Sequence, residues 1–473
     1  MAVDQKVIDV MEKVEKEIVD KGFFDAKDKF DQHVYSLLQP KEEEDKNYLL
    51  ILKRFNSFTP ALPRPHKKQK GEKEEKGKIE DIRGGGYYLR WRGKGIAIDP
   101  GFDFIQNLAS AKLAIGDIDA VVLTHGHNDH YIDLDPILSL LYEFNDLIQN
   151  KAQGLNAFFM GYSEQAKGNH EQALEYFRNM LEINHSDRVG QIGVNFCLSQ
   201  LGAKGEEVTD YDIRDLKREY ENIEGLTPEN LHKKIDLFLA RSSQKTVDSF
   251  IPLNLDQIKN VYLLNPGSDK DCNEYNFHLH FIPAKHMDLY GRSHCIGLRF
   301  DLKGENSKTV LHLGITSDTG YYTRLEQINN RITYKNLSNE FIDCSLLVAH
   351  IGSMQRQEFK WLKDNKKDQN LKKYLYKKHL GILGLTKLIS ELNPEILELC
   401  IISEYGEEMK DCRIELTKIL NNVFQEKPVF RTGDIGLKAK LNKPVQIYIN
   451  DHPERPKDVN ERYDNKGGIE YYK

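Results

Sequence analysis

The spacing of apolar residues changes several times along the chain, and each change predicts a different kind of element. Within the first forty residues, apolar side chains recur every three or four positions, which is the spacing of an amphipathic helix. The run YLLILKRFNSF (48–58) is dense in apolar and aromatic residues and predicts the first strand of a core sheet. Two more strands are expected in the glycine-flanked stretch 84–101, and IDAVVLTH (118–125) predicts a short buried strand.

A long segment after Tyr131 has helical spacing instead. Within it, Gly161, Gly168, Ala173 and Phe177 stand at spacings that resemble a tetratricopeptide repeat. The following unit is degenerate, and a stable stack usually needs at least three repeats. We therefore expect a repeat-like helical insertion, with an ordinary helical hairpin as an equally weighted alternative.

Strand patterns return in the second half of the chain and then alternate with helices. Runs such as FHLHFIPAKH (277–286), KTVLHLGITSDTG (308–320) and CSLLVAHIGS (344–353) predict strands. Two β-rich halves with helices outside them, interrupted by the insertion, are therefore expected. The predicted parts are an N-terminal helical segment (1–47), the first half of the β-rich domain (48–144), the helical insertion (145–255), and the second half with a C-terminal tail (256–473).

Composition narrows the class of protein. The chain has 473 residues, of which 39% are hydrophobic and 30% charged, as in a globular protein with a polar surface. No run approaches the ~18 apolar residues of a membrane span, and the polar start is unlike a signal peptide. Six scattered cysteines are typical of a reduced, cytoplasmic protein rather than a disulfide framework. The net charge of −6 argues against a general nucleic-acid coat. We expect a cytoplasmic protein without membrane association.

The densest group of metal-binding side chains follows the predicted strand 118–125. His125, His127, Asp129 and His130 form a His-x-His-x-Asp-His pattern within six residues. Divalent ions such as Zn²⁺ bind imidazole nitrogens and carboxylate oxygens, and two histidines separated by one residue in an extended turn face the same point. The pattern therefore predicts a metal site at the end of this strand.

With this motif, the chain resembles the metallo-β-lactamase-fold superfamily of metal-dependent hydrolases from about Tyr48 to Tyr448, apart from the helical insertion. The resemblance implies an α+β fold, a four-layer αβ/βα sandwich with the site at the shared edge of two sheets. It implies two divalent ions, with zinc preferred and manganese or magnesium as alternatives. The implied metal ligands are His125, His127, Asp129, His130, His286 in IPAKH and Asp318 in SDTG, with Asp99 in IAIDPG supporting the ligand loop.

The last ligand of the second ion departs from the family pattern. Glu404, in SEYGEE, stands where a histidine usually completes that site, and a carboxylate is an acceptable ligand there. His379 and His350 are the rival residues for this position. We assign Glu404 as the ligand and His379, at a helix start, as the group that protonates the leaving oxygen. Asp129 and His379 are therefore the predicted catalytic residues.

The expected reaction is hydrolysis by a hydroxide held between the two ions. Lysines recur between Lys360 and Lys378, and Lys377 and Lys378 directly before His379 are predicted to contact an anionic substrate. These features favour a phosphodiester in a nucleic acid or a nucleotide. A lactone or amide hydrolase of the same fold is the alternative, and so is a regulatory protein whose helical insertion docks a protein partner.

Overall fold

The computed structural model describes residues 46–54, 84–183, 232–286, 295–323, 336–360, 373–406, 412–425 and 427–449, together with isolated positions elsewhere. The chain forms two compact units. The smaller unit combines Met1–Gln39 with Ser139–Lys233, and the larger combines Pro40–Leu138 with Lys234–Lys473. None of the helices in the described part of the chain has the length and apolar character of a membrane span.

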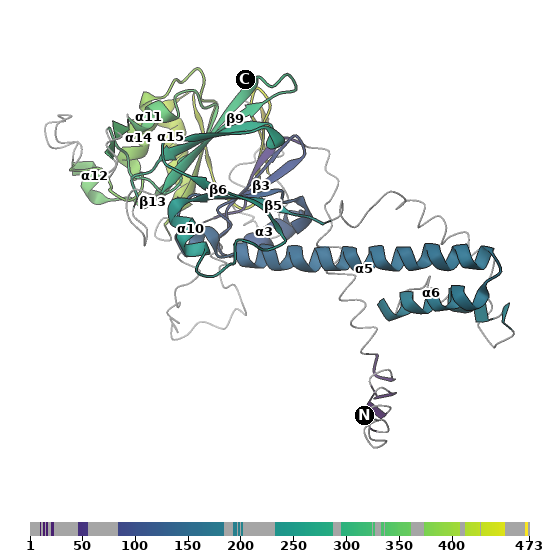
Figure 1. The fold of residues 1–473 in the computed structure, drawn as a ribbon. Helices are drawn as coiled ribbons and strands as arrows, with labels where there is room; N and C mark the ends of the chain where they lie inside the picture. The colour runs from purple at the N-terminus through teal and green to yellow at the C-terminus, as the bar shows by residue number, and fades with distance from the viewer. Residues whose placement is uncertain are drawn as a thin grey trace, which may run out of the picture. The chain divides into compact units, whose positions relative to one another are not determined.

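The larger unit contains a nine-stranded mixed sheet (Figure 1). The order of its strands is β18-β17-β16-β1-β2-β3-β4-β5-β6. Strands β3 to β6 run parallel, and β1 pairs antiparallel with both β2 and β16. Their bounds are β1 Tyr48–Ile51, β2 Tyr87–Trp91, β3 Lys94–Ile98, β4 Ala120–Leu123, β5 Ile235–Ala240, β6 Ile258–Leu264, β16 Leu437–Lys440, β17 Gln446–Ile449 and β18 Ile469–Tyr471.

A seven-stranded mixed sheet forms the other half of this unit, in the order β15-β14-β13-β10-β9-β8-β7. Its parallel strands β13 and β14 are buried along their whole length, as continuous apolar strands covered on both faces should be. The bounds are β7 Asp269–Cys272, β8 Phe277–Pro283, β9 Ile296–Lys303, β10 Thr309–Ile315, β13 Leu346–Gly352, β14 Leu399–Tyr405 and β15 Val429–Thr432. A separate two-stranded sheet pairs β11 (Leu325–Glu326) with β12 (Thr333–Tyr334).

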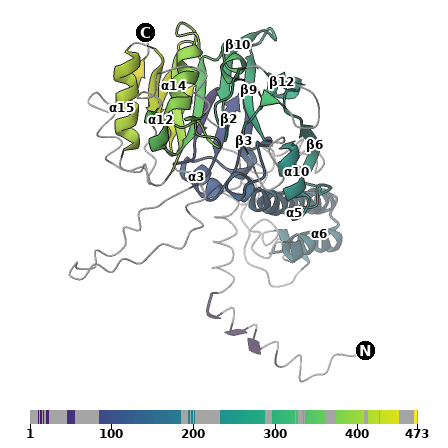
Figure 2. The ribbon, with the colours of Figure 1, turned by 90° about the vertical axis from the view of Figure 1, so that its left-hand side faces the viewer.

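The two large sheets face each other across one core. A single hydrophobic cluster joins residues such as Ile98 and Val122 of the first sheet to Phe300 and Leu313 of the second. On the outer face of the second sheet, another cluster includes residues of α14 and α15, which Figure 2 shows lying against that sheet. The helices of this unit are α3 Phe104–Ser110, α4 Asn128–Tyr131, α10 Arg241–Val247, α11 Leu337–Glu340, α12 Arg356–Lys360, α14 Ile382–Glu391 and α15 Arg413–Phe424, with 3₁₀ turns η2 Ile115–Asp117 and η3 Asn273–Tyr275.

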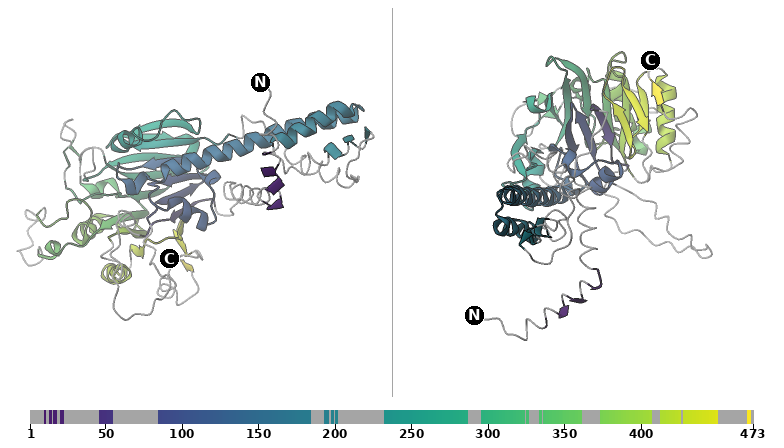
Figure 3. Two further views of the ribbon diagram at one scale, coloured as in Figure 1. Left: turned by 90° about the horizontal axis from the view of Figure 1, so that it is seen from below. Right: turned by 90° about the vertical axis from the view of Figure 1, so that its right-hand side faces the viewer.

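Two helices dominate the described part of the smaller unit. Helix α5 (Leu134–Ala166) begins in the larger unit and continues without a break, and α6 (His170–Ile183) returns alongside it (Figure 3). The ring of Phe177 lies against Gly161, where an added Cβ would be 3.0 Å from the ring. The packing of Phe177 in α6 against Gly161 in α5 is that of two antiparallel helices in a helical hairpin. The repeat-like insertion stays a prediction, because most of the sequence that would form the next repeat lies outside the described residues.

One element differs from the sequence-based expectation. Residues 145–255 were expected to be helical, yet β5 within this range pairs with β4 and β6 in the nine-stranded sheet, and α10 packs on β5. All six residues of β5 are buried, so its apolar run IDLFLA has no alternation to mark it as a strand. Short apolar runs of this kind fit a buried strand and a buried helix equally well.

Candidate metal centre

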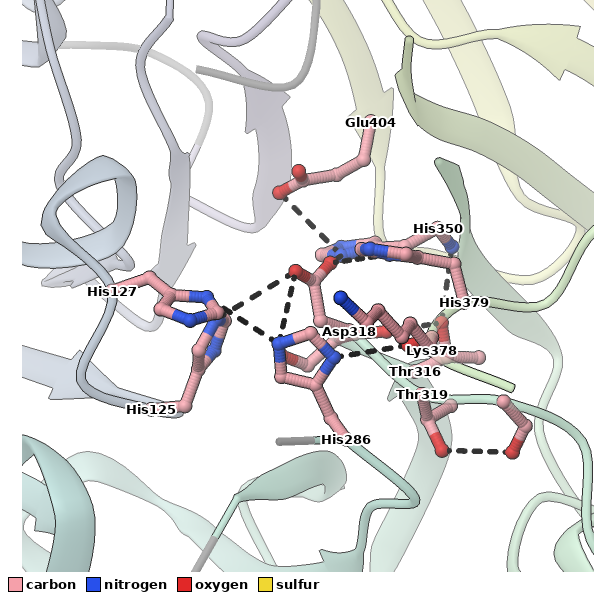
Figure 4. A network of polar contacts seen from close by, with 12 residues as sticks. His125, His127, His286, Thr316, Asp318, Thr319, His350, Lys378, His379 and Glu404 are labelled. Carbon is pink, nitrogen blue, oxygen red and sulfur yellow. Dashed lines mark hydrogen bonds and ion pairs between the residues drawn. The ribbon is translucent and has the colours of Figure 1, made fainter. Parts of the chain in front are cut away.

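Strand ends bring most of the predicted ligands together. Parallel strands place their carboxyl ends at one edge of a sheet, where open α/β sheets bind their ligands. Figure 4 shows three imidazoles, those of His125, His127 and His286, pointing towards Asp318. The residues are His125 and His127 after β4, His286 after β8, Asp318 after β10, His350 in β13, Glu404 in β14 and His379 shortly before α14.

Four of these residues form what we call the histidine-rich group: His125, His127, His286 and Asp318. One ligand atom from each lies within 4.8 Å of the others. His127 Nδ1 is 3.1 Å from His125 Nε2 and 3.3 Å from His286 Nε2, while Asp318 Oδ2 is 3.6 Å from His125 Nε2. Three nitrogens and one carboxylate oxygen therefore converge on a single point.

Hydrogen bonds on the far side of the rings fix which nitrogens point inwards. His286 Nδ1 donates to the Lys378 carbonyl at 3.0 Å, which leaves its Nε2 as an acceptor. His125 Nδ1 lies 3.1 Å from Thr124 Oγ1, whose own proton goes to Asp99. Burial lowers the pKa of both His125 and His286, so both imidazoles are kept neutral. Neutral imidazoles with inward lone pairs are what a divalent ion requires.

Beside this group lies what we call the acidic group: Asp129, His130 and Glu404. Its three ligand atoms also lie within 4.8 Å of one another, and all three residues are buried. His130 Nε2 is 3.5 Å from Asp129 Oδ2 and 3.9 Å from Glu404 Oε1. Asp318 Oδ2 lies 3.8 Å from the same nitrogen. Asp318 therefore lies between the two groups and is within reach of both.

A lysine that sequence reasoning missed is bonded to the acidic group. Lys53 is fully buried, and its Nζ donates to Glu404 Oε1. Burial lowers the pKa of Lys53, but Glu404, Asp129 and Asp318 outweigh burial and raise it above its ordinary value. The ammonium is therefore retained. The one signal in the sequence was a lysine directly after the apolar run YLLIL, where a charge has to find a buried partner.

Asp99 is hydrogen-bonded to the segment that carries the predicted ligands. Its carboxylate accepts from the Thr124 backbone N–H at 2.8 Å, the Thr124 hydroxyl at 2.6 Å and His130 Nδ1 at 3.0 Å. Asp99, Ser317 and Glu404 have φ angles of 49°, 52° and 57°, a region that non-glycine residues rarely adopt. Such strained positions cluster at functional sites, because the surrounding structure has to hold them.

His350 and His379 both contact the second carboxylate oxygen of Asp318, Oδ1. Each has its Nδ1 3.4 Å from Asp318 Oδ1. His350 is fully buried, its Nε2 is 2.9 Å from the Tyr87 hydroxyl, and its Nδ1 is also 3.4 Å from Glu404 Oε1. All three residues considered for the last ligand position therefore lie at the centre, and their roles stay predictions.

The two lysines predicted to contact substrate are exposed beside the centre. Lys377 and Lys378 lie in the turn that leads to His379, and both side chains are open to solvent. The contact that the structure gives Lys378 with the centre is through its carbonyl oxygen, which accepts from His286 (Figure 4). Substrate binding by these side chains stays a prediction. Residues 361–372 of the lysine-rich segment lie outside the described residues.

The donor set decides which ions suit the centre. Three imidazoles and a carboxylate at the histidine-rich group suit zinc, and first-row ions such as manganese are compatible. The acidic group offers two carboxylates and one imidazole around a lysine ammonium. The histidine-rich group therefore fits a divalent ion, whereas the acidic group already contains a cation.

One stretch of the chain has a known family pattern. Residues 87–141 match the Metallo-beta-lactamase superfamily model. This stretch runs from β2 into the start of α5 and contains the whole His-x-His-x-Asp-His motif. The two mixed sheets confirm the predicted α+β fold class, and the matched stretch has the pattern of the Metallo-beta-lactamase superfamily.

Known proteins are similar in sequence to a short part of this chain. Ribonuclease Z of Thermobifida fusca is 40% identical over 53 residues, or 11% of this chain and 17% of the relative. Ribonuclease Z of Nocardia farcinica is 42% identical over 53 residues, with the same coverage. The chain thus aligns with less than a fifth of the length of these curated relatives. The metallo-beta-lactamase fold protein YhfI from Bacillus subtilis, a solved structure, covers 84% of this chain and 99% of its own, with 10% identity and a TM-score of 0.42.

Proposed function

We propose that the chain is a metal-dependent hydrolase whose substrate is a phosphodiester in a nucleic acid or a nucleotide. The observation that carries the proposal is the histidine-rich group, with three imidazoles directed at one carboxylate. When bound there, a divalent ion supplies Lewis acidity and lowers the pKa of water. Zinc is the first choice for this donor set, with manganese or magnesium as alternatives.

The protein's own residues supply position and protons. Asp318 orients His379 through the 3.4 Å contact between its Oδ1 and the imidazole Nδ1. Burial lowers the pKa of His379, but the carboxylate of Asp318 outweighs burial and raises it, which favours the protonated ring. A protonated imidazole at the edge of the centre is placed to give its proton to a leaving oxygen. Asp129, the other predicted catalytic residue, lies beside His130, with its Oδ2 3.5 Å from His130 Nε2.

Two features support a phosphodiester over a lactone or amide. The relatives that match the motif region are named Ribonuclease Z. The exposed ammonium groups of Lys377 and Lys378 next to His379 attract an anion rather than an apolar acyl group. Docking of a protein partner on the helical insertion stays a prediction from sequence.

The experiment that tests the proposal is a metal-dependent activity assay. The full chain is stripped with a chelator, reloaded with Zn²⁺, Mn²⁺ or Mg²⁺, and assayed on bis-p-nitrophenyl phosphate, single-stranded RNA, and a panel of lactones and amides. We expect hydrolysis of the diester that depends on the added ion. Activity confined to lactones or amides, or diester hydrolysis that ignores the chelator, would contradict the proposal.

A matched pair of variants ties this activity to the centre. His286→Ala removes a member of the histidine-rich group, whereas His278→Ala removes a half-buried histidine of β8 that lies beside Asp269, Asp271 and the ring of His280. The first variant should lose the activity and the second should keep it. Equal losses in both would indicate a general effect of replacing histidines near β8.

A further inference from the structure

The lysine in the acidic group is held there by its neighbours in the chain. Lys53 follows β1, and Leu52 before it binds Gly86 through its N–H at 3.0 Å and Asn107 through its carbonyl at 2.8 Å. Arg54 after it donates from Nε to Asp434 Oδ1 at 2.8 Å. The backbone on both sides is thus fixed. The Lys53 side chain is directed into the acidic group by the fold and is not a surface lysine that happens to reach inwards.

A cation already lies in the acidic group. Four buried carboxylates, those of Asp99, Asp129, Asp318 and Glu404, lie in or beside the two groups. The Lys53 ammonium is bonded to one of them, Glu404. A second divalent ion in the acidic group would have to approach this ammonium in a buried site, where the repulsion between two cations is strong.

Building on the proposed hydrolase, we propose that the Lys53 ammonium takes the place of a second metal ion, so that the chain holds one divalent ion at the histidine-rich group. The sequence-based expectation of two ions rests on ligands that are all present. Among the described residues, however, Glu404 Oε2 and His130 Nε2 have no hydrogen-bond partner. A second ion would need these same two atoms, so the number of bound ions has to be measured directly.

The test counts ions in the full chain. After chelation, the chain is reloaded with excess Mn²⁺ or Zn²⁺ and dialysed, and the bound ions are counted by native mass spectrometry and elemental analysis. We expect one ion per wild-type chain and one in Lys53→Arg, which keeps the charge. Lys53→Met, of similar length but neutral, should hold two. Two tightly bound ions in the wild-type chain would overturn the inference, and so would a folded Lys53→Met chain that still holds one.

Two histidine variants keep the inference testable if Lys53→Met fails to fold. His127→Ala should lose the single ion, whereas His130→Ala should keep it. If two ions were bound, each variant would retain one. The Mn²⁺ electron paramagnetic resonance spectrum adds a second readout, because one isolated ion gives a six-line signal and a pair gives an exchange-coupled spectrum. A chain that binds no ion at all would refute the proposed hydrolase as well, whereas a count of two would refute only the role of Lys53.

Discussion

The histidine-rich group and the acidic group lie side by side but differ in charge. The first presents three imidazoles, and burial keeps His125 and His286 neutral. The second presents two carboxylates and one imidazole around an ammonium. In the second group, burial and Lys53 lower the pKa of His130, but Asp129, Asp99 and Glu404 outweigh them and raise it to about 9. The imidazoles of His125 and His286 are therefore neutral, whereas the second group contains the Lys53 and His130 cations, although Asp318 contacts both groups.

This difference shows that ligand-type residues alone do not define a metal site. A divalent ion binds to deprotonated ligands, and its position must not already be occupied by another cation. The histidine-rich group meets both conditions without rearrangement. The acidic group has ligand atoms, but Glu404 Oε1 is bonded to the Lys53 ammonium. If Lys53 takes the place of the second ion, as we propose, the two ions expected from the histidines and acids in the sequence are one too many.

The largest effect is expected from Asp318→Asn, because Asp318 is the residue common to both groups. The amide removes the charge that faces His125, His350 and His379. We expect loss of the bound ion and a fall in diester hydrolysis of roughly 10³-fold or more, since the ion's chemistry is lost with it. Elemental analysis and kcat/KM measure the two effects. A variant that keeps both its ion and its activity would show that Asp318 is dispensable to each group.

His379→Ala should separate chemistry from metal binding. If His379 protonates the leaving oxygen, kcat should fall by about 10²-fold or more for a substrate with a poor leaving group, since general acid catalysis contributes about 10²–10⁴-fold. With a p-nitrophenolate leaving group, which needs no proton, the loss should be much smaller. The ion count should stay at its wild-type value. A chain that loses its ion instead would assign His379 to the metal, and Glu404→Ala then tests whether that carboxylate is dispensable.

Thr124→Val should weaken the histidine-rich group without touching the acidic one directly. It removes the hydroxyl that lies 3.1 Å from His125 Nδ1 and donates to Asp99. Loss of such a supporting partner typically weakens metal affinity by about 10–100-fold. A competition titration against a chelator of known affinity measures this change. Unchanged affinity would mean that the orientation of His125 is set by packing alone.

The smallest effect is expected from Asp133→Asn, a change near the centre but outside both groups. Asp133 Oδ2 accepts from the Ile105 N–H at 3.0 Å in α3, and burial raises its pKa to about 6. Because the folded pKa exceeds the unfolded one, the wild-type protein loses stability as pH rises from about 4 through 6. Asp133→Asn has no carboxyl group at this position to titrate, so its stability does not fall for this reason.

Relative to wild type, the free energy of unfolding of Asp133→Asn should therefore rise by about 1–2 kcal/mol between pH 4 and pH 7, discounted because Asp133 is partly exposed. Urea unfolding at several pH values measures it, and the ion count serves as the control. A pH-independent difference between the two proteins would contradict the assigned shift.

The residues of the histidine-rich group, which the structure brings together, could be selected from the sequence because their signals are local or follow strand ends. His125 and His127 belong to one short motif, and His286 and Asp318 each follow an apolar run that ends a strand. The β-rich halves were predicted for the same reason. Strand β5 was missed because its short apolar run, which follows a long helical segment, fits a buried helix as well as a buried strand. Lys53 was missed because its partner Glu404 lies 351 positions away. Pairing over that distance is a property of the sheet and leaves no local pattern.

The pairing of β1 has a consequence for synthesis of the protein. Strand β1 lies between β2, which follows soon after it, and β16, which is among the last strands to be made. Asp434, which holds Arg54, is also a late residue. On the ribosome, a chain grows by about 5–20 residues per second. The nascent chain therefore carries its complete HGHNDH motif for many seconds before β1 and Arg54 gain these partners, and during this interval the proposed exclusion of a second ion by Lys53 is not yet in place.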